Sequence, residues 1–229
     1  MPSWGVLLHA TLGLFLLLAG REWAALAGVR SALAQWSYAG LLCVVLELVN
    51  RLLADPVIRQ TLAAASVAVW LLVSLFLVRH AKALPQARLA TSTGLVLGLL
   101  VLGPFWLSAA WLKALDARLL LAAAVLVWLA DSLAYFVGRA FGQRRLAPAI
   151  SPAKTWAGVV GAMAAAPIVS LVLGLIRPAT GFPFLPLLGL CVLTVGVSIV
   201  GDLLESLLKR LAGVKDSGNL LPGHGGVLD

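Results

Sequence analysis

The sequence predicts an all-α, polytopic integral membrane protein of about seven transmembrane helices. Of its 229 residues, 62% are hydrophobic and 11% are charged. A soluble domain of this length would need roughly a quarter of its residues charged. The apolar runs approach or exceed the about 20 helical residues needed to cross about 30 Å of hydrocarbon. They are rich in Leu and Ala and do not alternate with polar residues, so the sequence predicts no strands in them.

Seven apolar segments account for the helix count. In order they are 4–20, 32–49, 61–78, 89–112, 118–137, 156–176 and 184–204. The first lacks a preceding basic region and a clear cleavage site, so we expect it to stay as a span. Gly103-Pro104 interrupts the fourth and is expected to kink or split it. We expect one membrane domain over 1–229, with N-terminal spans in 1–117 and the polar motifs in 118–229.

The net charge of +8 is unevenly distributed between the segments. Twelve of the 17 Lys and Arg residues follow the first, third, fifth and seventh segments. The positive-inside rule then predicts a bacterial-type inner (plasma) membrane protein whose N-terminus is outside. The polar loop 138–155 and the C-terminal tail would both face the cytoplasm, giving a polar active site on that side. The basic residues are spread over many loops, so nucleic acid is not an expected partner.

A first polar cluster runs from Asp131 to Arg139 at the end of the fifth segment. Asp131 and Tyr135 are four residues apart and therefore share a helix face. Acids within membrane spans are costly and often functional. A structural acid near the interface, with its hydrogen bonds satisfied, is the alternative.

A second cluster runs from Ser151 to Gly158. Ser151 followed by Pro152 predicts a helix start, with the serine as N-cap and proline at the first helical position. Lys154 would then lie in the first turn, where a cation is unfavourable unless an anion binds the helix N-terminus. A lysine that only sets membrane topology is the alternative.

A third cluster fills the tail from Val200 to Asp229. Its helical part places Asp202, Glu205, Ser206 and Lys209 on one face. The acids suit Mg²⁺, and the bases suit phosphoryl oxygens. A salt-bridged helix end is the alternative. The glycines around His224 permit positive φ and a close approach of backbone to ligand.

The tail resembles the signature of the phosphatidate cytidylyltransferase (CDP-diacylglycerol synthase) family. That signature is matched here by Ser206, Lys209, Arg210, Lys215, Asp216, Gly218, Pro222, His224, Gly225, Gly226 and Asp229. Asp131 to Arg139, Ser151 to Gly158, and Gly201-Asp202 with Glu205-Ser206 are similar to other segments of the family. Glu22-Trp23 is similar to a weaker early motif.

The resemblance implies transfer of a cytidylyl group from CTP to phosphatidate in the membrane, with Mg²⁺ as cofactor and a second cation as an open alternative. It also implies a homodimer. The implied metal ligands are Asp202, Asp229 and Asp131. The implied catalytic residues are Lys154, Lys209, Arg210, Lys215, Asp216 and His224. The implied substrate-binding residues are Ser151, Tyr135, Arg139, Ser206, Gly225 and Gly226.

Three other functions stay open from the sequence. The family's pattern continues after the position of Asp229 with Arg-x-Asp and a further span, and this sequence ends at Asp229. The metal site is therefore expected to lack one acid, and a truncated, inactive relative that binds lipid or partners is one alternative. A CTP-dependent lipid kinase, releasing CDP instead of pyrophosphate, is another. A transporter with Asp131 and Glu47 as relay acids is the third.

Overall fold

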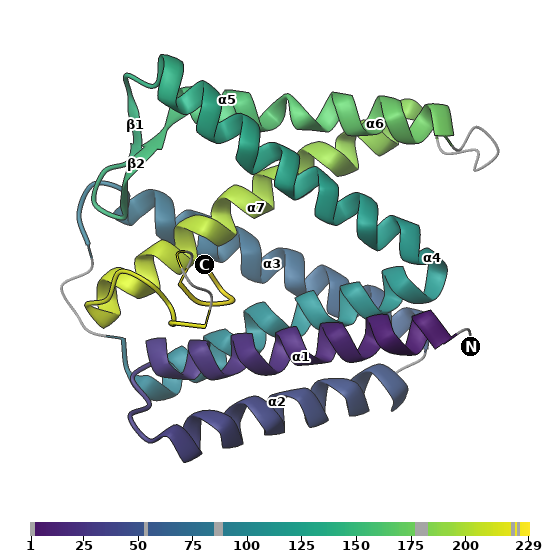
Figure 1. Cartoon of the computed structure of the whole chain (residues 1–229), viewed down its shortest axis with the longest axis vertical. Coiled ribbons are helices and arrows are strands. Elements are labelled where there is room, and N and C mark those ends of the chain that lie inside the picture. The colour runs from purple at the N-terminus through teal and green to yellow at the C-terminus, as the bar shows by residue number, and fades with distance from the viewer. Residues whose placement is uncertain (1–2, 53–54, 85–88, 177–182, 221–222, 224) are drawn as a thin grey trace. The chain divides into compact units, whose positions relative to one another are not determined.

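The computed structural model describes residues 3–52, 55–84, 89–176, 183–220, 223 and 225–229. In this part of the chain, six helical segments are long and apolar enough to span a membrane. The predicted all-α membrane fold is confirmed. The elements are α1 (Ser3–Leu26), α2 (Ala32–Leu52), α3 (Pro56–His80), α4 (Thr91–Phe141), β1 (Arg145–Ala147), β2 (Ser151–Thr155), α5 (Trp156–Met163), α6 (Ala165–Ile176) and α7 (Phe184–Ala212), as Figure 1 shows.

The fourth and fifth predicted segments are joined in α4, which explains six helical segments where seven were expected. α4 has 51 residues. At about 1.5 Å per residue this is roughly 75 Å, more than twice the hydrocarbon thickness. The helix breaks at Asp116, whose backbone is extended (φ −167°, ψ 118°). The Asp116 carboxylate accepts a hydrogen bond from the Arg118 amide at 2.9 Å, as a helix N-cap does. Helical backbone continues through Pro104, so the interruption expected there lies at Asp116 instead.

The chain divides into two compact units. Unit 1 comprises 1–72, 85–114 and 207–229, and unit 2 comprises 73–84 and 115–206. In unit 1, α1 packs along α2 (Figure 1). A Cβ at Gly20 would lie 3.3 Å from the Cβ of Ala39, so glycine permits this close approach. The indole of Trp23 donates to the Gly94 carbonyl at 2.9 Å and ties α1 to the start of α4.

In unit 2, small side chains let α5 and α6 pack against α4 and α7. Its buried core consists of Leu126, Ala130, Ala162, Ala165, Ala166, Val169, Cys191 and Val195. A Cβ added at Gly161 would lie 2.7 Å from the Cβ of Val137, closer than real Cβ atoms approach. The glycine therefore sets how near α5 can come to α4.

A short antiparallel hairpin precedes α5, with β1 paired to β2. The predicted helix start at Ser151-Pro152 is wrong, because both residues lie in β2. The N-cap is Thr155, whose hydroxyl accepts a hydrogen bond from the Gly158 amide at 3.1 Å. Lys154 therefore precedes the helix and does not lie in its first turn. The predicted N-cap at Ser151 is therefore wrong, and the cap lies four residues later, at Thr155.

Candidate active site

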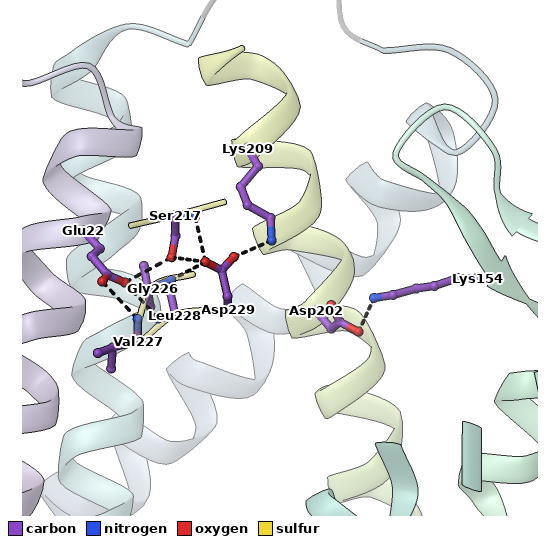
Figure 2. A network of polar contacts seen from close by, with 9 residues as sticks. All are labelled: Glu22, Lys154, Asp202, Lys209, Ser217, Gly226, Val227, Leu228 and Asp229. Atoms are coloured by element: carbon purple, nitrogen blue, oxygen red, sulfur yellow. Dashed lines mark hydrogen bonds and ion pairs between the residues drawn. The ribbon is translucent and has the colours of Figure 1, made fainter. Parts of the chain in front are cut away.

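Three motif residues from distant parts of the sequence meet in unit 2. They are Asp131 of α4, Lys154 of β2 and Asp202 of α7, called here the acid–lysine cluster. Lys154 forms an ion pair with Asp202, as Figure 2 shows. Asp131 interacts electrostatically with both of them, attractively with the lysine and repulsively with the other acid. The Asp202 side chain is 52% exposed and that of Lys154 is 25% exposed, so the cluster is open to a ligand.

Close packing at two glycines, one in α4 and one in α5, holds the end of β2 and the start of α5 beside α4. A Cβ at Gly158 would lie 3.0 Å from the carbonyl oxygen of Ala134, and one at Gly138 would lie 3.1 Å from the Thr155 hydroxyl. Both contacts are tighter than most real Cβ atoms tolerate. The glycines thus keep the strand that carries Lys154 against the helix that carries Asp131.

The predicted substrate-binding residues of unit 2 occupy different environments. Arg139 donates to the Tyr135 hydroxyl at 3.0 Å, and both side chains are exposed on α4. Ser151 is half-buried at the start of β2, and Ser206 is half-buried on α7. Tyr135 and Arg139 are therefore hydrogen-bonded to each other on α4, the helix that also carries Asp131.

A second set of polar contacts organises the tail in unit 1. We call Glu22, Lys209, Ser217, Gly226 and Asp229 the tail cluster (Figure 2). One oxygen of Asp229 accepts from the Lys209 ammonium at 2.7 Å. The other accepts from the backbone amides of Ser217 at 2.8 Å and Gly226 at 2.6 Å. Only 8% of the Asp229 side chain is exposed, so this carboxylate fixes the loop through several charge-assisted hydrogen bonds.

Glu22 is a site residue that the sequence reasoning did not assign. It is 2% exposed and accepts from the amides of Val227 and Leu228, each at 2.9 Å. The Ser217 hydroxyl lies 3.1 Å from the Glu22 carboxylate and 2.9 Å from that of Asp229. α1 therefore anchors the end of the tail. The available signal was the weak Glu22-Trp23 similarity, together with an acid inside an apolar helix.

The tail glycines serve two purposes. Gly223 (φ 79°) and Gly225 (φ 118°) adopt left-handed backbone, which confirms the predicted positive φ in this loop. A Cβ at Gly218 or Gly226 would lie 2.9 Å or 2.7 Å from the Glu22 carboxyl carbon. These two glycines therefore allow the loop backbone to approach the Glu22 carboxylate closely.

The other predicted tail residues are placed as follows. Arg210, Lys215 and Asp216 are exposed. His224 and Pro222 lie outside the described residues. The tail therefore presents two cations, at 210 and 215, on exposed side chains.

The donor chemistry of the acid–lysine cluster fits a hard divalent cation. Two carboxylates that repel each other, Asp131 and Asp202, offer the oxygen ligands that Mg²⁺ prefers. Across the described ranges, no group of three or more His, Cys, Asp or Glu side chains is close enough to hold a metal. At Asp229 a cation would have to displace Lys209 or backbone amides. The assignment of these three acids as metal ligands stays a prediction.

Comparison with known proteins identifies the family. The family model described as "Cytidylyltransferase family" matches residues 2–229. A phosphatidate cytidylyltransferase of Pseudomonas aeruginosa is 40% identical over 210 residues, covering 91% of this chain and 76% of the relative. Phosphatidate cytidylyltransferases of Haemophilus influenzae and Bacillus subtilis are 51% and 46% identical over 123 and 110 residues. These two matches cover 48% and 47% of this chain, and 40% and 39% of the relatives. Because the family model spans nearly every residue, this chain belongs to the cytidylyltransferase family.

Proposed function

We propose that this chain transfers the cytidylyl group of CTP to phosphatidate, forming CDP-diacylglycerol and pyrophosphate. Family membership and the names of its relatives support a nucleotidyltransferase of phospholipid biosynthesis. The structural observation that carries the proposal is the meeting of Asp131, Lys154 and Asp202 in unit 2.

The reaction depends mainly on positioning and charge. A phosphate oxygen of phosphatidate forms a bond to the α-phosphorus of CTP, and the bond from that phosphorus to pyrophosphate breaks. The lipid phosphate is already ionised near neutral pH, so it needs no strong general base. Neutralising the phosphoryl oxygens and aligning the two substrates supply the rate enhancement.

Each charged residue of the acid–lysine cluster has a role in this scheme. Lys154 binds phosphoryl oxygens as a compact cation with three donors. In the free protein, its ion pair with Asp202 holds the ammonium in place. Bound Mg²⁺ would neutralise the triphosphate and the leaving pyrophosphate, and Asp202 with Asp131 would hold it. With Asp202 engaged by a cation, Lys154 would be available to bind phosphate.

The tail contributes charge and order. Arg210 and Lys215 are exposed cations that we assign to phosphate binding. Lys209 is held by Asp229, which also binds the loop backbone. A second copy of the chain is a further proposed partner, from the family resemblance alone.

We assign the chain to the inner (plasma) membrane, with the 138–155 loop and the tail at the cytoplasmic face. Twelve of 17 Lys and Arg residues support this orientation. It gives the site access to cytosolic CTP, while the phosphate of the lipid substrate lies at the same membrane interface.

The test is the Asp202→Asn variant of the full chain, reconstituted with phosphatidate, CTP and Mg²⁺. We expect turnover to fall by about 100-fold or more, since a charged group that stabilises the transition state is lost. Asp55→Asn is the matched control. It removes an acid whose side chain caps α3, and asparagine caps a helix equally well. Pyrophosphate release identifies cytidylyl transfer, whereas CDP release would identify a lipid kinase.

Lys154→Gln alone and combined with Asp202→Asn provides a second measurement. Because the two side chains are paired, their effects on turnover should not add. Near-normal turnover in folded Asp202→Asn protein would remove Asp202 from the site.

A further inference from the structure

A charged pocket lies in unit 1, and none of its lining residues belongs to the two clusters described above. It has a volume of about 680 Å³ and is lined by residues of α1, α2, α3 and α4. Its polar lining residues are His9, Glu47, Asn50, Arg51, Arg59, Trp111 and Lys113. On α1, His9 precedes the tail-binding Glu22 by more than three turns, which is about 20 Å of helix. The pocket is therefore separate from the tail cluster.

The pocket has more positive than negative charge. Glu47 accepts from the Nε of Arg51 at 2.6 Å and lies 3.3 Å from the Nε2 of His9. This acid is thus already shared by two partners. In the described part of the chain, neither Arg59 nor Lys113 has an acidic side chain within ion-pair distance. Glu47 also attracts Lys113 electrostatically, so one acid faces the three cations Arg51, Arg59 and Lys113 and the pocket keeps a net positive charge.

The geometry of Arg59 suits an anion with several oxygens. Its guanidinium lies over the Trp111 ring, 5.2 Å from the centroid, so the ring limits the orientation of the guanidinium. A fixed guanidinium fork matches phosphate oxygens. The Nε of Arg59 and the indole nitrogen of Trp111 are buried, with no hydrogen-bond partner in the described ranges. An acceptor that entered after a small side-chain rotation would satisfy these donors, which are costly to leave unbonded.

The remaining lining is apolar and small. It consists of Gly5, Val6 and Ala10 of α1 and Ala110 and Ala114 of α4. A tryptophan, an arginine and a lysine beside an apolar wall are typical of a membrane interface, where lipid headgroups lie.

We propose that this pocket binds the phosphate of an anionic phospholipid, with Arg59 and Lys113 as the phosphate ligands and the small apolar residues beside the acyl chains. Its residues are different from those assigned above to cytidylyl transfer. It rests only on unit 1 and does not depend on the proposed function.

The test is native mass spectrometry of the purified full chain with phosphatidylglycerol, with phosphatidylcholine as the zwitterionic reference. Phosphatidylglycerol is not the proposed substrate, so a negative result here leaves the proposed function untouched. We expect R59Q/K113Q to reduce phosphatidylglycerol retention by about 30-fold, or about five-fold per cation. R79Q/K82Q removes the same charge from exposed positions outside the pocket and should retain the lipid.

A variant that should increase lipid retention controls for the possibility that R59Q/K113Q misfolds. E47Q removes the acid of the pocket and frees Arg51, so anionic lipid retention should increase. Equal retention by the wild type, R59Q/K113Q and E47Q would overturn the proposal. Displacement of the lipid by millimolar glycerol phosphate would also overturn it, because the site would then take a soluble phosphate. Failure of glycerol phosphate to compete supports a lipid ligand.

Discussion

Glu22 should control whether the tail stays docked on α1. Glu22→Ala removes the acceptor for the amides of Val227 and Leu228 and one for the Ser217 hydroxyl. Each buried donor left without a partner costs about 1–3 kcal/mol. Counting only the two amides, docking should weaken by about 2–6 kcal/mol. The undocked population should therefore rise by at least about 30-fold.

Amide hydrogen exchange measures this population directly. In Glu22→Ala, the Ser217, Gly226, Val227 and Leu228 amides should exchange at least about 30-fold faster than in the wild type. Glu22→Gln keeps one acceptor oxygen and should give an intermediate rate.

Glu47→Ala is the control for this experiment. It removes an acid that contacts His9 and Arg51, and the tail should stay protected. Unchanged protection of the tail amides in Glu22→Ala, with α1 still folded, would refute the anchoring role.

Three further substitutions test local features. Thr155→Val removes the N-cap hydroxyl of α5 and should lower the unfolding free energy by about 1 kcal/mol. Thr155→Ser keeps a hydroxyl at this position and should leave the unfolding free energy unchanged. Thermal unfolding in detergent measures both variants. Gly161→Ala inserts a methyl into the α4–α5 contact and should lower the unfolding free energy by about 1–3 kcal/mol in the same assay. Gly174→Ala, where the added Cβ would have no atom within 4 Å, should be neutral or stabilising. Equal effects of the two substitutions would contradict the packing argument. Asp229→Asn weakens the Lys209 contact, so tail amide exchange should accelerate, and unchanged exchange would exclude an anchoring role for that charge.

The sequence predicted the helices well. A long apolar run in lipid has to be helical, because only then are its backbone polar groups hydrogen-bonded within the segment. The sequence was a poorer guide to where helices begin and end. Pro104 is accommodated within helical backbone, while Asp116 interrupts α4 with an extended conformation and a side-chain cap. A short polar side chain that can bond a nearby amide competes with the helix as effectively as proline does.

The 145–155 hairpin shows why local signals were misplaced. Ser151-Pro152 is a valid helix start by local chemistry, but pairing of β2 with β1 draws these residues into a strand. Thr155, the last residue of that strand, then caps the helix. Capping rules consider only neighbouring residues in the sequence. They do not include the pairing of two strands across a turn, which decides the conformation here.

The part of the candidate site formed by charged motif residues could be predicted from the sequence. Asp131, Lys154 and Asp202 were expected to act together, and the structure brings them together in unit 2. Glu22 was missed as a site residue because its partners are backbone amides near the far end of the chain. Nothing in the identity of Val227 or Leu228 indicates that their amides bind a distant carboxylate.

The hydrogen bond between Glu22 and Leu228 spans 206 positions of sequence and has a consequence for biogenesis. During synthesis α1 leaves the ribosome and enters the lipid phase long before its amide partners exist. Until then, its carboxylate must remain hydrated at the headgroups or accept hydrogen bonds from other donors. Folding of this enzyme should therefore include a distinct step, the capture of residues 226–229 by the first helix, detectable by pulse-chase proteolysis.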